Sequence, residues 1–275
     1  MNLKNYFPRT KKVEPREANA SKNFMPLIMP ADKEKIGWVS PVYSKSRAIK
    51  LDPDTLAKNR LVAMIPNSPE IDFYKVLRTR ILRRTVDQGG HSLMITSALP
   101  GEGKTVTAIN LALTFAKEYE QTVLLVDGDL RMQRIHELMG YESDKGLLDY
   151  LIDDCPVSDL IVWPGIEKLS VISGGRTINE SSESLTSPRM RELVADMKSR
   201  YPERYIFFDV PPVLAGADAM AFAPLVDWII FVVHAGQTSM QDVNRALQVL
   251  PQEKILGLVL NRQTTQLKAY PYRYG

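Results

Sequence analysis

The sequence has few of the residues that crosslink a chain or hold a metal by themselves. Its 275 residues contain one cysteine, Cys155, and 3 histidines, which stand far apart at His91, His136 and His234. A single cysteine excludes an intrachain disulfide, and these two patterns exclude a multi-cysteine site or a local histidine motif for a metal. This cysteine usage is typical of a reducing compartment.

Long hydrophobic runs are also absent. The longest apolar run, 228–233, is far shorter than the roughly 20 residues that a membrane span needs. The first residues, MNLKNYFPRTKK, contain no apolar stretch of the kind found in secretory signals. With 44% hydrophobic residues, the chain has enough apolar material to form a folded core. We therefore expect a soluble, cytoplasmic protein.

Acidic residues are scarce at the start of the chain. Residues 1–60 contain 13 Lys and Arg but 6 Asp and Glu, whereas the net charge of the whole chain is +3. Residues 1–40 are rich in Pro, Lys, Asn and Ser and have no sustained period. We predict a flexible basic arm over residues 1–66, favoured as a solvated linker. Contact with anionic lipid is the alternative, and no nucleic-acid partner is expected.

From residue 67 the chain has the pattern of a folded domain. Ser68, Pro69 and Glu70 predict a helix start with a serine cap, a proline at the first position and an acid in the first turn. Six apolar, strand-like runs then alternate with amphipathic stretches: 92–96, 122–126, 169–172, 205–210, 228–233 and 255–260. Such runs indicate strands of a parallel sheet that helices cover on both faces. We predict a doubly wound, mostly parallel α/β domain over residues 67–262 and a separate C-terminal segment over 263–275.

The first of these strands leads into a glycine-rich loop, SALPGEGKT at 97–105, and a helix follows at once. This is the strand–loop–helix setting of a P-loop, with Ala98 in place of the usual first glycine. Glycines let backbone N–H groups turn toward phosphate oxygens, Lys104 can reach the β- and γ-phosphates, and the Thr105 hydroxyl can bind Mg²⁺. The predicted nucleotide contacts are Pro100, Gly101, Glu102, Gly103, Lys104, Thr105 and Val106.

Carboxylates follow two further strands. Asp127 and Asp129 lie in VDGDLR, and Asp209 ends the strand before VPP. Ligands of open α/β sheets bind at the carboxyl ends of the strands, where these residues must lie. We expect Thr105, Asp129 and Asp209 to hold Mg²⁺ on bound ATP, and Asp127 to serve as a base or to orient the nucleophile.

Two further residues have a binding and a structural interpretation each. Arg131, directly after the second pair of acids, would hold the loop or a phosphate, and a surface salt bridge is the alternative. Asn261, after the last strand, would read the adenine ring, and a structural turn is the alternative.

The order PGEGKT, LLVDGDLR and FFDVPP resembles the Walker A, A′ and B motifs of the bacterial tyrosine kinases, over roughly residues 68–262. The stretch PVYSKSRAIKLDPDTLAKNRLVA is also similar to the subgroup found in exopolysaccharide loci with an exosortase. The resemblance implies an ATP-dependent protein-tyrosine autokinase that regulates capsule or exopolysaccharide synthesis and export. Its catalytic residues would be Lys104, Asp127 and Asp129.

The same resemblance implies partners. The family has an E-x-x-R-x-x-R signature for subunit contacts on the helix before the P-loop, and this chain has Asp72, Lys75 and Arg78 there. A ring-like homo-oligomer is therefore expected, although Lys75 lacks the bidentate geometry of an arginine. The expected activator is the cytoplasmic segment of a membrane polysaccharide chain-length protein, which would recruit the kinase to the inner face of the membrane. Other proteins phosphorylated on tyrosine are further possible partners.

The last six residues, YPYRYG, carry Tyr270, Tyr272 and Tyr274. Proline, arginine and glycine favour an extended segment over a helix. Behind a kinase P-loop, such a segment is expected to be the autophosphorylation substrate. A segment docked on the body of the protein is the alternative.

Two rival functions use the same P-loop. A partitioning or cell-division type ATPase carries an early signature lysine in a K-G-G-x-G-K-T pattern, and Leu99 occupies that place here. The missing lysine argues against this mechanism, because the lysine reaches the nucleotide of the partner subunit. The other rival is a regulatory nucleotide-binding scaffold without phosphoryl transfer.

Overall fold

The computed structural model describes residues 46–118, 120–178 and 181–263. Within them, one eight-stranded sheet has the order β1-β4-β5-β3-β6-β2-β7-β8. The strands are β1 (Arg47–Ala48), β2 (Ser92–Ser97), β3 (Thr122–Asp127), β4 (Ile161–Trp163), β5 (Leu169–Ile172), β6 (Arg204–Asp209), β7 (Trp228–His234) and β8 (Ile255–Asn261). All neighbouring pairs are parallel except β4 with β5.

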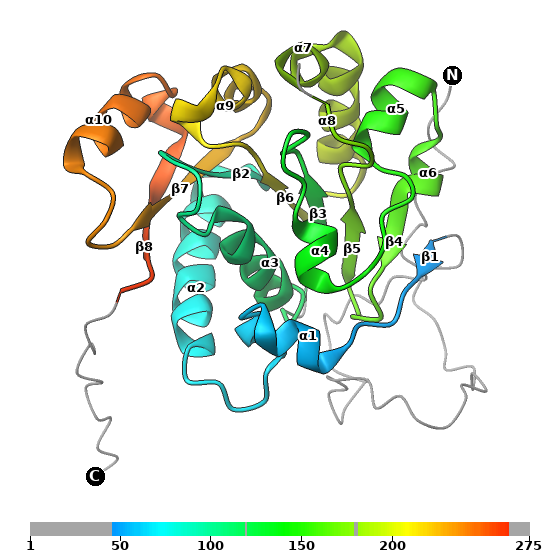
Figure 1. The fold of residues 1–275 in the computed structure, drawn as a ribbon, viewed down its shortest axis with the longest axis horizontal. Coiled ribbons are helices and arrows are strands. Elements are labelled where there is room, and N and C mark those ends of the chain that lie inside the picture. The colour runs from blue at the N-terminus through cyan, green and yellow to red at the C-terminus, as the bar shows by residue number, and fades with distance from the viewer. Residues whose placement is uncertain (1–45, 119, 179–180, 264–275) are drawn as a thin grey trace.

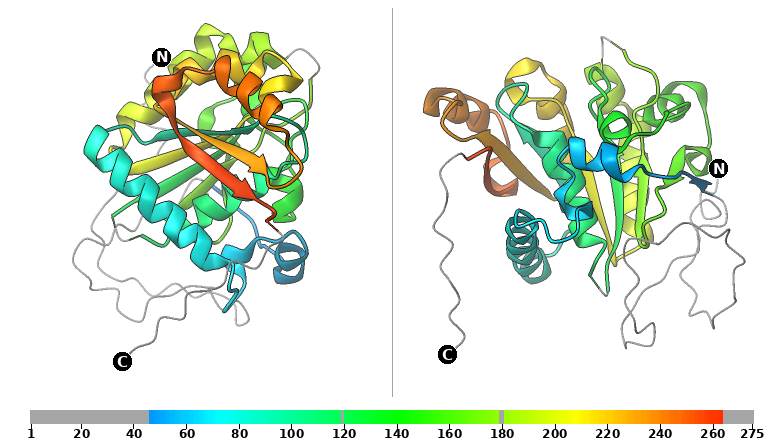
Figure 2. Two further views of the ribbon diagram at one scale, coloured as in Figure 1. Left: turned by 90° about the vertical axis from the view of Figure 1, so that its left-hand side faces the viewer. Right: turned by 60° about the horizontal axis from the view of Figure 1, so that its bottom comes forward.

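Helices cover both faces of this sheet (Figures 1 and 2). The α-helices are α1 (Pro53–Lys58), α2 (Ile71–Gln88), α3 (Lys104–Phe115), α4 (Ile135–Met139), α5 (Leu147–Asp153), α6 (Val157–Leu160), α7 (Ser181–Thr186), α8 (Pro188–Arg200), α9 (Asp218–Phe222) and α10 (Met240–Gln248). The short 3₁₀ helices are η2 (Val62–Met64), η3 (Val213–Ala215), η4 (Ala223–Leu225) and η5 (Gln252–Lys254).

The central strands are buried on both faces, as the uninterrupted apolar runs predict. In β2, Leu93 and Ile95 pack into the core beneath α1 to α4, while Met94 packs into the core beneath α5 to α10. Every residue of β2, β3 and β6 is buried. The predicted doubly wound, mostly parallel sheet is confirmed, and the carboxyl ends of β2, β3 and β6 lie side by side in its centre.

The segment before the P-loop helix differs from the prediction. Residues 46–66 form β1, α1 and η2, and Leu51, Leu56 and Leu61 are buried in the core. The expected flexible arm is therefore wrong for residues 46–66, which the short apolar pairs of this stretch did not reveal as an element. Residues 1–45 lie outside the described part of the chain.

The start of α2 also needs correction. The helix begins at Ile71 with Glu70 as its N-cap, and no side chain caps it. The hydroxyl of Ser68 donates to Glu70 Oε2 at 2.6 Å rather than accepting from the helix. The proline and the acid correctly mark the region, but the predicted serine cap is wrong.

Short elements were not predicted. The strands β1 and β4 contain 2 and 3 residues, and α6 contains 4, so none of them shows a readable period. Among the described residues, none of the helices has the length and hydropathy that a bilayer crossing requires.

Candidate nucleotide-binding site

The glycine-rich loop lies where the sequence places it, between the end of β2 and the first residue of α3, Lys104. Gly101 and Gly103 have φ angles of 82° and 91°, in the left-handed region that glycine adopts without strain. A Cβ on Gly103 would lie 2.1 Å from Asn261 Nδ2, so a side chain here would displace Asn261 from its bond to the Glu102 oxygen. The loop therefore presents the N-terminus of a largely buried helix, which favours bound phosphate.

Lys104 connects this loop to the acids of two neighbouring strands. Its Nζ lies 2.8 Å from Asp129 Oδ2 and 3.3 Å from Asp209 Oδ1. The Thr105 hydroxyl donates to Asp209 Oδ2 at 2.7 Å. The structure thus brings together one cation, one hydroxyl and two carboxylates that the sequence separates by 105 positions.

The donor set fits a magnesium ion bound together with phosphates. A threonine hydroxyl and two aspartates offer hard oxygen ligands, and Mg²⁺ usually takes one or two carboxylates and completes its shell with water and substrate phosphates. Among the described residues, no three His, Cys, Asp or Glu side chains are grouped as a metal site of their own.

The electrostatics of this cluster are unbalanced. Burial raises the pKa of Asp209, against the opposing effect of the Lys104 charge. Burial disfavours the Lys104 ammonium, but the charges of Asp209 and Asp129 outweigh it and raise the pKa of Lys104. Three aspartates around one lysine leave an excess of negative charge, which a divalent cation would offset.

Asp127 is fully buried beside this cluster. Its Oδ1 accepts the N–H of Asp129 at 3.2 Å, and its Oδ2 accepts those of Arg134 and Ile135 at 3.1 and 3.0 Å. Burial, followed by the charge of Asp209, raises its pKa to about 8. These contacts shape the loop after β3, and the role of Asp127 as a base for the incoming hydroxyl stays a prediction.

Arg131 connects the loop after β3 to helices α7 and α9. Its Nε donates to Ser181 Oγ at 2.8 Å and lies 3.2 Å from Asp218 Oδ2, while Ser181 donates to Asp218 Oδ1 at 2.6 Å. Asp218 is 1% exposed. The ion pair therefore joins the loop after β3 to α7 and α9. Sequence reasoning named Arg131 but missed Ser181, because no motif marks a lone serine.

Asn261 lies against the P-loop. Its Nδ2 donates to the backbone oxygen of Glu102 at 2.8 Å, and its Oδ1 accepts the N–H of Arg262 at 2.9 Å. Arg262 has a φ of 56°, so the chain turns sharply here. The structural turn is observed, and adenine recognition by Asn261 stays a prediction.

The residues expected to contact other subunits do not share one environment. Lys75 Nζ lies 2.8 Å from Asp72 Oδ1 on the exposed face of α2. Arg78 instead turns toward its own chain, where it donates to the Thr114 oxygen at 2.9 Å and pairs with Glu118 at 2.5 Å. The structure therefore leaves Asp72 and Lys75 exposed and uses Arg78 within the fold.

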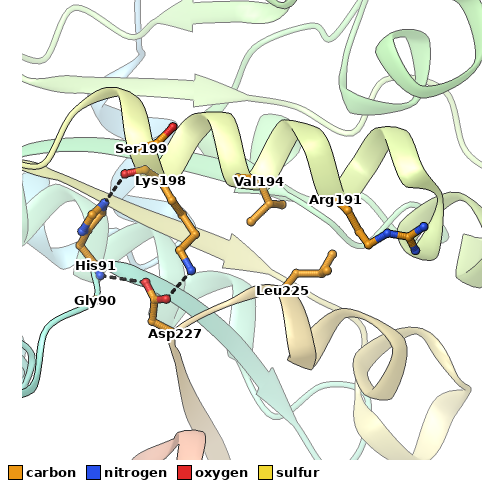
Figure 3. Close-up of a pocket in the computed structure, with 9 residues that line it drawn as sticks. Gly90, His91, Arg191, Val194, Lys198, Ser199, Leu225 and Asp227 are labelled. Atoms are coloured by element: carbon orange, nitrogen blue, oxygen red, sulfur yellow. Dashed lines mark hydrogen bonds and ion pairs between the residues drawn. The ribbon is translucent and has the colours of Figure 1, made fainter.

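An open hollow lies at the opposite, amino end of the sheet (Figure 3). It has a volume of about 540 Å³ and lies between α8 and the start of β7. Lys198 forms an ion pair with Asp227 there, and His91 Nε2 lies 3.0 Å from the Lys198 backbone oxygen. None of the predicted nucleotide-binding residues lines it.

Comparison with known proteins agrees with this geometry. A family model described as an AAA domain matches residues 92–256. The chain is 32% identical over 232 residues to "Tyrosine-protein kinase YwqD" of Bacillus subtilis, covering 83% of this chain and 96% of that protein. It is 35% identical to "Putative tyrosine-protein kinase AmsA" of Erwinia amylovora, covering 77% of this chain but 29% of that longer protein.

Solved structures give the same assignment. The kinase domain of the Escherichia coli tyrosine kinase ETK superposes with a TM-score of 0.67 at 28% identity, covering 86% of this chain and 95% of that one. Fold and loop define a P-loop protein whose nucleotide site lies at the carboxyl end of a parallel sheet. The chain belongs to the bacterial tyrosine kinase family.

Proposed function

We propose that this chain transfers the γ-phosphoryl group of ATP to tyrosines of its own C-terminal segment. The cluster of Lys104, Thr105, Asp129 and Asp209 at the end of the P-loop supports the proposal most directly, because it combines a phosphate-binding lysine with ligands for Mg²⁺. When bound, Mg²⁺ would neutralise charge on the β- and γ-phosphates, held by Thr105, Asp129 and Asp209.

Lys104 must change partners in this function. In the structure, its ammonium neutralises two of the carboxylates that would hold the metal. Arrival of Mg-ATP would release Lys104 toward the phosphates and leave those carboxylates to the cation. The loop N–H groups and Lys104 would then stabilise the charge on the transferred group, while Asp127 accepts or orients the phenolic proton.

The acceptor tyrosines are Tyr270, Tyr272 and Tyr274, which lie outside the described residues. The described chain ends at 263, directly after a turn that contacts the P-loop through Asn261. A segment of ten residues spans up to roughly 35 Å, so these tyrosines can reach the site of their own or of a neighbouring subunit. Phosphate groups beside Arg273 would change the charge of the segment, and we propose that this loosens a ring-like homo-oligomer.

The biological setting is also proposed. One relative, 31% identical to this chain, is named "Succinoglycan biosynthesis transport protein ExoP" of Rhizobium meliloti, and the chain covers 34% of its length. We propose control of exopolysaccharide synthesis and export. The activator would be the cytoplasmic segment of a membrane polysaccharide chain-length protein, which would bring this kinase to the inner face of the membrane.

Phosphate counting by intact-mass spectrometry tests the proposal. Wild-type protein incubated with Mg-ATP should gain up to three phosphates. The variant with Phe at positions 270, 272 and 274 should gain none, and neither should Lys104→Met. Retention of all phosphates by the triple phenylalanine variant would refute the tail as the substrate.

A second candidate is a switch ATPase. The cell-division ATPase MinD of Pyrococcus furiosus is 27% identical, with a TM-score of 0.54 over 64% of this chain. Leu99 stands where such proteins carry their signature lysine. Hydrolysis of ATP without any phosphate on the protein, also in the presence of an activator segment, would favour this candidate.

A further inference from the structure

Glu102 occupies a variable position of the P-loop motif, yet the residue is 3% exposed and both of its carboxylate oxygens accept hydrogen bonds. Oε2 accepts the N–H of Leu99 at 2.7 Å, from the other side of the same loop. Oε1 accepts the N–H of His234, the last residue of β7, at 3.3 Å and the hydroxyl of Thr238 in the turn that follows. The Glu102 backbone oxygen accepts Asn261 Nδ2 at the end of β8.

This arrangement is unexpected for a phosphate-binding loop. A carboxylate beside the phosphates of ATP is unfavourable by charge, and an alanine would leave the motif intact. This carboxylate instead accepts hydrogen bonds from neutral groups, the N–H of Leu99 and His234 and the hydroxyl of Thr238. Hydrogen bonds to a charged acceptor are stronger than neutral ones. Glu102 therefore stabilises the conformation of the loop.

We infer that Glu102 is a positioning residue that sets the phosphate-binding shape of the loop before the nucleotide binds. It bonds to the N–H of Leu99 within the loop and to Thr238 in the turn after β7, so both anchors are in place without bound phosphate. Preorganised donors need no rearrangement when charge arrives, which lowers the cost of binding. The inference rests on the proposed nucleotide function of this loop.

Thr238 offers the sharpest test, because it lies outside the Walker motifs. Its hydroxyl donates to Glu102 Oε1 and accepts the N–H of His234 at 3.2 Å. Thr238→Val keeps the shape and removes the hydroxyl, whereas Thr238→Ser keeps the hydroxyl. Glu102→Gln places an N–H₂ group against donors on one side and so breaks one of the two anchors.

The measurement is the dissociation constant of Mg-ATP together with the KM for ATP and kcat. Thr238→Val and Glu102→Gln should each raise the dissociation constant and KM about tenfold, roughly the loss of one hydrogen bond to a charged group. Glu102→Ala removes both anchors, so adding Thr238→Val to it should not weaken binding further, because the contact to Thr238 is already lost. Thr238→Ser should restore the affinity to within about twofold of the wild type.

A merely structural role gives a different result. It lowers the melting temperature of the nucleotide-free protein and leaves KM unchanged. Thr186→Val, which removes a hydroxyl bonded to the Ser182 oxygen of its own helix α7, is the matched control and should not change KM. Wild-type affinity in both Thr238→Val and Glu102→Gln would overturn the inference. Failure of the wild type itself to bind Mg-ATP would instead overturn the proposed function.

Discussion

Each end of the sheet has aspartate paired with a lysine: the acids at the carboxyl end are buried, whereas Asp227 at the amino end is half-buried. The pKa shifts of Asp209 and Asp227 have opposite directions. At the carboxyl end, burial raises the pKa of Asp209. At the amino end, burial also opposes the charge of Asp227, but hydrogen bonds from Lys198 and Ser92 outweigh it and lower its pKa. The negative charge of the aspartates at the carboxyl end is therefore not fully neutralised by its surroundings, whereas the negative charge of Asp227 at the amino end is.

The contacts explain the difference. Asp227 accepts the N–H of His91 at 3.0 Å and the Lys198 ammonium (Figure 3). It also accepts the N–H of Ser92 at 3.0 Å and the Ser92 hydroxyl at 2.7 Å. Asp209 shares one lysine with Asp129. Sites that bind ligands are often kept at a cost in stability, whereas a satisfied cluster of polar groups supports the fold.

The largest expected effect is on catalysis, from Asp209→Asn. Loss of a carboxylate ligand for Mg²⁺ should reduce phosphoryl transfer by about 100-fold or more. The stability of the nucleotide-free protein should stay equal or rise, because one unbalanced charge is gone while an oxygen remains to accept the Thr105 hydroxyl. Transfer assays and thermal unfolding check both parts. A melting temperature of this variant well below that of the wild type would contradict the difference between the two ends of the sheet.

The next effect is on stability, from Asp227→Asn. The change leaves Lys198 without its carboxylate and places an N–H₂ group against either its ammonium or the backbone donors, so the free energy of unfolding should fall by about 2–3 kcal/mol. Transfer activity per folded molecule should stay at the wild-type level. Urea unfolding measures the loss, with Asp196→Asn as a comparison, which breaks an ion pair to Arg200 of the same helix α8. A stability equal to the wild type would show that this cluster does not support the fold.

The smallest effect is a dependence on pH. The pKa of Asp227 lies below its ordinary value of 3.8 in the folded protein, so its contribution is present above that value and is lost as the pH falls through the folded pKa. The advantage of the wild type over Asp227→Asn should therefore be constant near neutral pH and shrink below about pH 4. Unfolding curves across this range measure it. An advantage that grows on acidification would have the wrong sign for this account.

The fold was predictable because its core is regular. Strands such as β3 and β6 are uninterrupted apolar runs with acids at their carboxyl ends, and the P-loop has a fixed spacing. Lys104, Thr105, Asp129 and Asp209 were therefore placed correctly at the carboxyl end of the sheet. The short strand β4 and the burial of Leu56 of α1 in the core were not predictable. Their burial depends on distant segments, which no local period records.

The nucleotide-binding site was also predictable only in part. The motifs identify which residues meet at the phosphate loop, but not the contacts made by variable positions. Glu102 was named only as part of the loop, and its bonds to Leu99 and Thr238 depend on how the ends of β2 and β7 meet. Ser181 and Asp218 were likewise invisible as partners of Arg131, because 50 and 87 positions separate them from it along the chain.

We propose that Lys104 at the carboxyl end of the sheet binds the nucleotide, whereas Lys198 at the amino end stabilises the fold. Calorimetric titration with Mg-ATP of the wild type, Lys104→Met and Lys198→Met tests it most directly. We predict that Lys104→Met weakens binding by at least about tenfold and that Lys198→Met binds within about twofold of the wild type. Equal affinities in the two variants would contradict the account.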